Sequence, residues 1–166
     1  MKLKGIIDCD FVNYKKPCMT LMFPNCSFKC DHENGTNLCH NRGLALEPTL
    51  DIKIDTILDI YLENPLTEAL VFQGLEPFDS WEDVQALVAA FRYYSGDPIV
   101  IYTGYTEEEI QDKLKWLAVY EDGSPVVVKF GRYRPNEEPH YDTILGVNLA
   151  SSNQYAKEIK YEDYHK

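Results

Sequence analysis

One stretch decides the fold class: Ile99-Val100-Ile101-Tyr102-Thr103-Gly104-Tyr105-Thr106-Glu107-Glu108-Glu109. Its apolar beginning predicts a buried strand, and Thr103-Gly104-Tyr105 predicts the turn that closes this strand. Thr106 to Glu109 form a capping box, which predicts a helix that continues toward Trp116. A strand, a glycine turn and a helix in this order are the repeating unit of α/β proteins.

The residues before this stretch follow the same order. Apolar side chains recur at helical spacing over residues 51–63, which predicts a helix. The short apolar run 70–72 predicts a buried strand that breaks at Gly74. A second helix is predicted over about 80–96, with a cap-like beginning.

Two later strands are predicted at 126–128 and 144–147, with a polar loop over 132–142 between them. The charged tail from about residue 157 is expected to fray. This alternation predicts an α/β fold with a mostly parallel sheet and helices on its outer face. Because a closed eight-unit barrel usually needs ~250 residues, we expect an open or partial (βα) barrel in a single domain, residues 1–166.

Composition excludes some classes of protein. The chain has 16 Lys plus Arg and 27 Asp plus Glu, and its net charge of -11 opposes attraction to the phosphates of nucleic acids. The first residues lack the apolar run of a signal peptide, and no stretch approaches the ~20 apolar residues of a membrane span. We therefore expect a cytoplasmic protein with neither a nucleic acid nor a membrane as its partner.

Three of the cysteines are clustered, with Cys26 and Cys30 separated by three residues and Cys39 following after eight more. Clustered thiols in a reducing compartment are typical of metal or redox chemistry. Four cysteines saturate a structural zinc ion or an iron–sulfur cluster, whereas three leave one metal position open for an outside molecule. The pattern predicts a metal centre with an open position, and Cys9 and Cys18 are expected to be small buried side chains.

Five motifs, in order along most of the chain, resemble the radical S-adenosylmethionine superfamily. The resemblance is strongest to the small activating enzymes of anaerobic ribonucleoside-triphosphate reductase. The motifs are Asp10-Phe11-Val12-Asn13, the cluster loop 26–41 ending in Cys-His-Asn, Gly74-Leu75-Glu76-Pro77, Tyr102-Thr103-Gly104-Tyr105 and Ser151-Ser152-Asn153-Gln154. A single tetrapeptide is weak support, but five in the same order are specific.

The chain departs from the family pattern in several places. The family usually spaces its cysteines as Cys-x3-Cys-x2-Cys, so six extra residues must loop out before Cys39, and the Asn34-Gly35 turn signal favours such an excursion. Leu75 stands where the family has a second glycine. The family's amino-terminal Gly-Pro-Gly and arginine are missing, and Tyr155 replaces the arginine that usually follows the last motif.

The resemblance implies a [4Fe-4S] cluster held by Cys26, Cys30 and Cys39, with S-adenosyl-L-methionine on the fourth iron. It implies an oxidoreductase that makes a 5′-deoxyadenosyl radical and installs a glycyl radical on a large partner, an anaerobic ribonucleotide reductase. A low-potential donor such as flavodoxin or ferredoxin would reduce the cluster. The residues expected to contact the cofactor are Leu38 and His40 beside the adenosine, Gly74 and Glu76 near the ammonium, Thr103 at the ribose and Lys129 at the carboxylate.

Two alternatives stay open. One is a small-molecule radical enzyme resembling 7-carboxy-7-deazaguanine synthase, whose members are also compact. The other is a noncatalytic interaction domain in which the three cysteines and His32 bind zinc.

Overall fold

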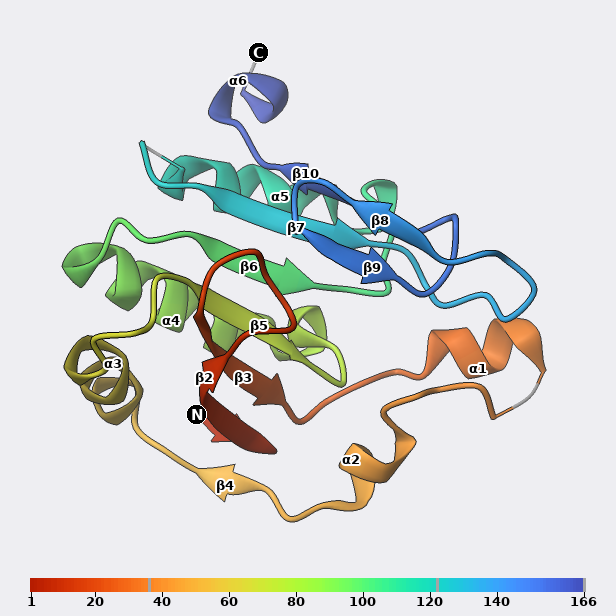
Figure 1. Cartoon of the computed structure of the whole chain (residues 1–166), viewed down its shortest axis with the longest axis horizontal. Helices are drawn as coiled ribbons and strands as arrows, with labels where there is room; N and C mark the ends of the chain where they lie inside the picture. Colours follow the sequence, from red (N-terminus) through yellow and green to blue (C-terminus); the bar gives the residue numbers. More distant parts are fainter. Residues whose placement is uncertain (36, 122, 166) are drawn as a thin grey trace.

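The computed structural model describes residues 1–35, 37–121 and 123–165, and its centre is a six-stranded sheet in the order β10-β7-β6-β5-β3-β2 (Figure 1). β3, β5, β6 and β7 are parallel, and β2 and β10 are antiparallel edge strands. The strands are β2 (Gly5–Asp10), β3 (Cys18–Phe23), β5 (Leu70–Gly74), β6 (Ile99–Tyr102), β7 (Val126–Phe130) and β10 (Tyr155–Glu158). The α/β class and the mostly parallel sheet are confirmed, whereas the described residues form an open sheet and no closed barrel.

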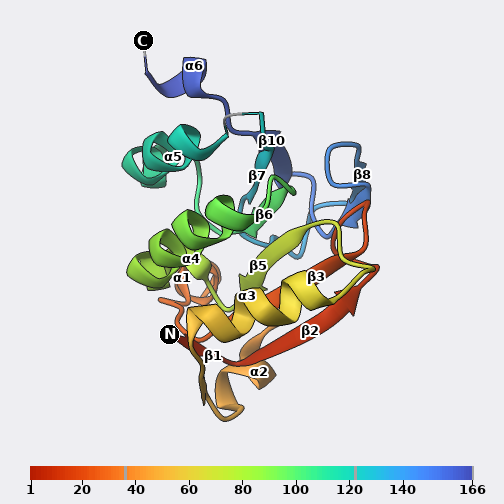
Figure 2. The same cartoon turned by 90° about the vertical axis from the view of Figure 1, so that its left-hand side faces the viewer.

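Three helices cover one face of this sheet (Figure 2). They are α3 (Ile54–Glu63), α4 (Trp81–Tyr94) and α5 (Gln111–Leu117). Alternate strand residues such as Phe72, Ile101 and Val128 point toward them and are fully buried. Burying a side chain of this size contributes roughly 1.5–3 kcal/mol, so this layer is the main core of the protein.

The opposite face is covered by a hairpin and a loop. The hairpin consists of β8 (His140–Asp142) and β9 (Val147–Leu149), and it packs over the strand residues that point away from the helices. Tyr14 lies in the same apolar layer. The Tyr102 hydroxyl donates a hydrogen bond to the Asn13 carbonyl (2.6 Å), which fixes the loop after β2 against the end of β6.

Short elements complete the chain. β1 (Lys2–Leu3) pairs with β4 (Leu50–Asp51). The cluster loop 26–41 contains α1 (Lys29–Asn34) and is followed directly by α2 (Arg42–Leu46). The 3-10 turns are Pro77–Ser80, Glu108–Ile110 and Ala118–Tyr120, and the last helix is α6 (Tyr161–Tyr164). Over the described residues, none of the helices combines the length and the apolar character that crossing a membrane requires.

Most of the predicted elements are confirmed, but the region after β7 differs. The strand predicted at 144–147 is wrong, because residues 143–146 form the turn between β8 and β9. Gly146 has a φ of 74° there, and the Asp142 carboxylate accepts hydrogen bonds from the backbone of the turn. The loop predicted over 132–142 ends in a strand, since β8 begins at His140.

Two further predictions need correction. The tail expected to fray from about residue 157 is part of the fold, because β10 pairs with β7 and Ile159 is fully buried. The helix predicted from Thr106 begins with the 3-10 turn Glu108–Ile110, and only half of the capping box forms, with Glu109 accepting from the Thr106 N–H at 2.9 Å. Strand β3 was not predicted.

Candidate functional site

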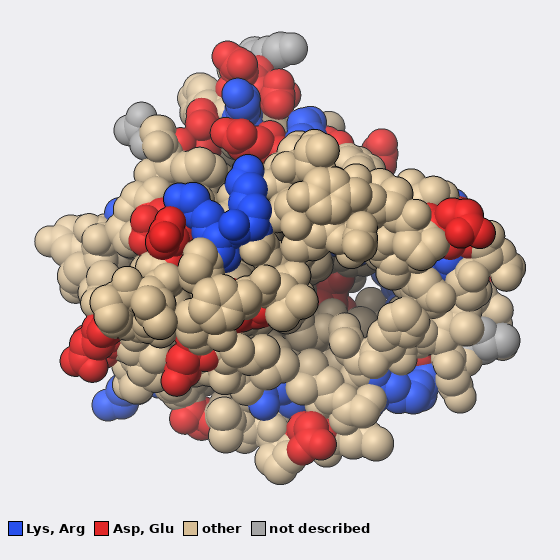
Figure 3. All heavy atoms as spheres, in the orientation of Figure 1, with Lys and Arg blue, Asp and Glu red and all other residues tan. Residues whose placement is uncertain are grey.

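A cavity of about 220 Å³ opens where the parallel strands end (Figure 3). In Figure 3 the surface is hollowed right of its centre, and charged side chains are visible in its depth. The carboxyl ends of parallel strands are the usual position of binding sites in open α/β sheets. Every residue predicted for the site lines this one cavity: Cys26, Cys30, Leu38, Cys39, His40, Gly74, Glu76, Thr103 and Lys129.

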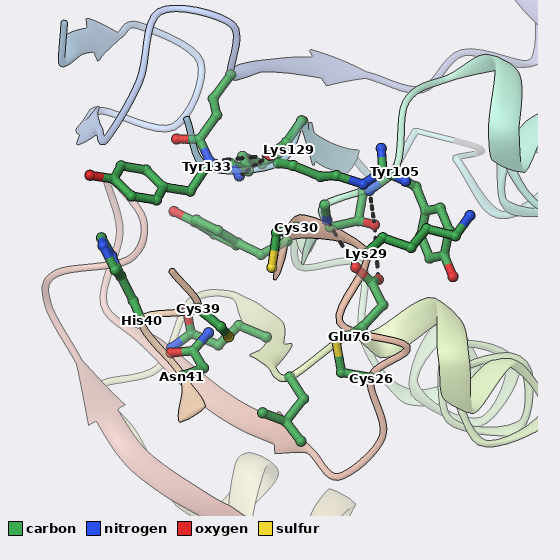
Figure 4. Close-up of a pocket in the computed structure, with 18 of the residues that line it drawn as sticks. Cys26, Lys29, Cys30, Cys39, His40, Asn41, Glu76, Tyr105, Lys129 and Tyr133 are labelled. Carbon is green, nitrogen blue, oxygen red and sulfur yellow. Dashed lines mark hydrogen bonds between the residues drawn. The ribbon is translucent and has the colours of Figure 1, made fainter. Parts of the chain in front are cut away.

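Three thiols reach the cavity from different parts of the cluster loop (Figure 4). Cys26 lies just after β3, Cys30 is in α1, and Cys39 follows the excursion. Burial raises the pKa of Cys26 to about 12, and burial followed by the proximity of Cys39 raises the pKa of Cys30. Burial therefore favours the protonated form of Cys26 and Cys30, and binding a metal to these two thiols must release protons.

The backbone at Phe28 is strained and directs a donor at Cys26. Phe28 has a φ of 51°, the only positive value for a non-glycine residue in the described part of the chain. Such a conformation costs on the order of 1–3 kcal/mol. It aims the Phe28 N–H at the Cys26 sulfur at 3.2 Å. Hydrogen bonds of this kind tune the reduction potential of a cluster that the sulfur ligates.

The positions of the three cysteines and of His32 can be compared with the ligand arrangements of a zinc ion and of an iron–sulfur cluster. Within the described residues, no group of three His, Cys, Asp or Glu side chains is close enough to surround one metal ion. His32, the fourth ligand of the zinc alternative, is exposed on α1 and does not line the cavity. A tetrahedral zinc ion needs its ligands in direct contact with one centre, whereas a four-iron cluster places each thiolate on a different iron. The zinc alternative therefore lacks its proposed fourth ligand at this cavity.

Glu76 is a buried carboxylate at the end of β5, and only 5% of it is exposed. It accepts hydrogen bonds from the Thr103 hydroxyl (2.8 Å), from the Gly104 N–H (2.9 Å) and from the Phe78 N–H (3.1 Å). Burial raises the pKa of Glu76 to about 7 despite these donors. A cation in the cavity would favour the ionised form.

Lys129 extends from β7 into the same cavity and is 7% exposed. Its ammonium donates to the Gly131 carbonyl at 2.9 Å. Burial lowers the pKa of Lys129 to about 8, although the charge of Glu76 opposes this shift. The cavity therefore presents one acid and one base with pKa values near neutrality, which is typical of binding and catalytic sites.

Gly74 is the point where several parts of the site meet. It has a φ of 105°, and a Cβ there would lie 2.6 Å from the backbone nitrogen of Phe23, so only glycine fits. The two residues after it donate backbone hydrogen bonds to the chain that leads to Cys26. The Asn41 side chain donates to the Gly74 carbonyl at 2.7 Å. Both ends of the cluster loop are thereby attached to the end of β5.

The Ser-Ser-Asn-Gln motif supports the turn that follows β7. The Asn153 amide donates to the Arg132 carbonyl (2.8 Å), and the Gln154 amide donates to the Gly131 carbonyl (3.1 Å). Gly131 has a φ of 97°, and a Cβ there would lie 3.0 Å from the Asn153 carbonyl oxygen. Since Lys129 also donates to the Gly131 carbonyl, this motif helps to hold Lys129 in the cavity.

Aromatic rings form the rim of the cavity and were not predicted individually. His40 packs against Tyr133, with ring centroids 4.3 Å apart. The Lys29 ammonium and the Arg132 guanidinium lie 4.6 Å and 5.7 Å from the centroid of the Tyr105 ring. Tyr105 and Lys29 belong to recognised motifs, so they could have been found, whereas Arg132 and Tyr133 lie outside all of the motifs.

The remaining cysteines lie away from this cavity. Cys18 is fully buried in the apolar layer under the β8–β9 hairpin, and its thiol donates to the Asp10 carbonyl at 3.4 Å. Cys9 is half-buried in β2. The prediction of a small buried side chain is confirmed for Cys18 and only partly met by Cys9.

The fold and the site define an α/β protein with a cavity lined by three cysteines at the carboxyl ends of its parallel strands. The model of the family described as "4Fe-4S single cluster domain" matches residues 17–154. The chain belongs to this family, which is consistent with the radical S-adenosylmethionine superfamily. The same comparisons find no match among curated proteins or among solved structures.

Proposed function

We propose that this protein is a radical S-adenosylmethionine enzyme that installs a glycyl radical on a larger partner enzyme. The proposed partner is an anaerobic ribonucleoside-triphosphate reductase, and the proposed electron donor is a low-potential flavodoxin or ferredoxin. The substrate position would be a glycine of the partner, from which the 5′-deoxyadenosyl radical removes one hydrogen atom to form 5′-deoxyadenosine.

One observation carries the proposal: three of the five cysteines line the cavity, and the other two do not. All five lie within the described residues, so protein thiols would fill three positions of a [4Fe-4S] cluster and leave one iron open. A cluster used only for electron transfer or structure is normally held by four cysteines. The open position supports a cofactor or substrate that binds directly to iron.

The residues that would hold the cofactor lie on two sides of the cavity. Cys26, Cys30 and Cys39 would bind the cluster, which, when bound, supplies the electron that splits the sulfonium of S-adenosylmethionine into methionine and the 5′-deoxyadenosyl radical. Glu76 is the proposed acceptor for the ammonium of the methionine part, and Lys129 the proposed donor to its carboxylate; the burial of both side chains beside the cavity supports these roles.

The rest of the cavity lining provides the proposed contacts to the adenosine and the ribose. Leu38 and His40 are the proposed neighbours of the adenosine, and Tyr133 packs behind His40. Thr103 is the proposed ribose contact, although its hydroxyl also donates to Glu76 and so holds that carboxylate in place. The cavity opens at the surface, as Figure 3 shows, which suits a loop of a partner protein.

The experiment starts from protein reconstituted anaerobically with iron and sulfide and reduced with dithionite. With S-adenosylmethionine and a candidate reductase, the wild type should release 5′-deoxyadenosine and produce the EPR doublet of a glycyl radical. Cys39→Ala should abolish both signals, because one iron loses its thiolate. Cys9→Ala is the matched control, since Cys9 is also half-buried but lies outside the cavity, and it should retain both.

Two results would count against the proposal. If Cys39→Ala still cleaves S-adenosylmethionine at the wild-type rate, the three-cysteine site is wrong. If the wild type forms 5′-deoxyadenosine but never a glycyl radical on the reductase, the activase role is wrong. The alternative of a small-molecule radical enzyme resembling 7-carboxy-7-deazaguanine synthase would then be favoured.

A further inference from the structure

Asp31 occupies an unusual position next to the cavity. It directly follows Cys30, and only 8% of it is exposed, although it lies on the short helix α1 in a loop that is largely at the surface. One oxygen of its carboxylate accepts hydrogen bonds from the backbone N–H groups of Leu38 (2.7 Å) and Cys39 (2.9 Å). The carboxylate therefore connects the residue after the second thiol to the third thiol itself.

The other oxygen of the carboxylate is also occupied. It accepts a hydrogen bond from Arg42, forming an ion pair. Arg42 additionally donates to the Asn37 side chain at 2.9 Å. These contacts join residues of the cluster loop to one another and to Arg42 at the beginning of α2, so they hold the two ends of the excursion together.

The unusual cysteine spacing explains why such a closure is needed. Eight residues separate Cys30 from Cys39, and a spacer of this length does not by itself fix the position of Cys39 relative to Cys30. The Asp31 carboxylate is a charged acceptor for two backbone N–H groups, and it holds them firmly because charge-assisted hydrogen bonds are roughly twice as strong as neutral ones. The two donors are the amide of the thiol ligand and the amide before it.

We infer that Asp31 is the positioning residue that brings Cys39 back to the metal site across the enlarged loop. The inference rests on the proposed function for the identity of the metal centre, but the hydrogen bonds are a property of the chain alone. Asp31 does not itself bind iron in this proposal. It acts through the backbone of Cys39, and Arg42 holds the carboxylate in the orientation that both amides require.

The first arm of the test uses cluster-free protein. Amide hydrogen exchange is measured by NMR in the wild type, Asp31→Ala, Asp31→Asn and Asp59→Ala. Asp59 is an exposed aspartate on α3, far along the chain from the cluster loop, and serves as the matched control. Asp31→Ala should speed exchange at Leu38 and Cys39 by roughly tenfold and leave β5 and β6 unchanged, whereas Asp59→Ala should change neither amide.

The second arm measures cluster assembly. In a titration with iron and sulfide, loss of a group that orients a metal ligand typically weakens binding on the order of 10- to 100-fold, so the loading midpoint of Asp31→Ala should shift by about tenfold. The EPR spectrum of its reduced cluster should also differ from wild type, which general destabilisation would not cause. Asp31→Asn retains one acceptor oxygen and should restore part of both properties.

The outcomes separate the two proposals. The positioning role is overturned if the amides of Leu38 and Cys39 exchange as slowly in Asp31→Ala as in the wild type. It is also overturned if the loading midpoint and the EPR spectrum of Asp31→Ala are both unchanged. A wild-type protein that assembles no cluster overturns the proposed function instead. In that case the exchange arm still decides whether Asp31 fixes Cys39.

Discussion

Replacing Gly74 by alanine tests how the site is anchored to the sheet. The new methyl carbon would lie 2.6 Å from the Phe23 nitrogen and 2.8 Å from the Met22 Cα, and both are backbone atoms that no rotamer change can move. A φ of 105° adds about 1–3 kcal/mol for a residue with a side chain. Overpacking of a well-packed region adds about 1–3 kcal/mol more.

Together these effects predict a loss of about 2–6 kcal/mol in the free energy of unfolding, a large part of the 5–15 kcal/mol typical of a domain. The assay is urea denaturation of cluster-free protein followed by circular dichroism. With a slope near 2 kcal/mol per molar urea, the midpoint should fall by about 1–3 M.

Gly43→Ala is the matched control for this measurement. Gly43 lies in α2, and a Cβ there would meet no atom within 4 Å. Alanine is favoured over glycine inside a helix by roughly 0.5–1 kcal/mol, so this variant should be at least as stable as the wild type. The reasoning is refuted if Gly74→Ala and Gly43→Ala change the free energy of unfolding by similar amounts. In that case the close approach of β3 and β5 does not restrict residue 74 to glycine.

Three further predictions concern charge and hydrogen bonding. The pKa of Lys129 is about 8 in the folded protein and 10.5 when unperturbed, so the cost of burying its charge is fully present below pH 8 and absent above pH 10.5. Buried thiols such as Cys26 titrate in the opposite sense over this interval, so the quantity to measure is the difference in unfolding free energy between cluster-free wild type and Lys129→Met, and the Lys129 contribution to it should rise by up to about 3 kcal/mol. Arg92 in α4 donates to backbone carbonyls in the segments leading to β6 and β7; Arg92→Lys leaves some of them unpaired, and urea denaturation should show a loss of about 3 kcal/mol. Asn41→Ala removes the bond to the Gly74 carbonyl and should lower stability by about 1 kcal/mol and raise the iron needed for half-loading, whereas unchanged values would show that Asn41 does not anchor the loop.

The central elements could be predicted because burial imposes a regular spacing on the sequence. Apolar runs followed by a glycine turn predicted β5 and β6, and apolar side chains at helical spacing predicted α3 and α4. Strand β3 is also an apolar run, but it leads into the cluster loop and not into a glycine turn and helix, so the repeating pattern missed it. The strands β8 and β9 have three residues each, too few for a period to appear, and their pairing depends on the turn that Asp142 stabilises.

For the site, motifs identified the residues that face the cavity but not those that hold them. Glu76 was predicted from the Gly-Leu-Glu-Pro motif and Lys129 as a candidate carboxylate contact outside the motifs, and both line the cavity. Asp31 and Asn41 act on backbone groups that are distant in sequence, and only the folded loop shows which N–H or carbonyl they reach. The sequence contains the donor and the acceptor, but no spacing rule connects them.

The attachment of the cluster loop to the end of β5 has a consequence for damage and repair. β5 lies between β3 and β6 in the interior of the sheet, where local opening is least frequent, whereas much of the cluster loop is exposed. If a bound cluster were lost, Gly74, Glu76 and Thr103 would stay in place at the sheet, and only the cysteine segment would need to reorganise before a new cluster binds.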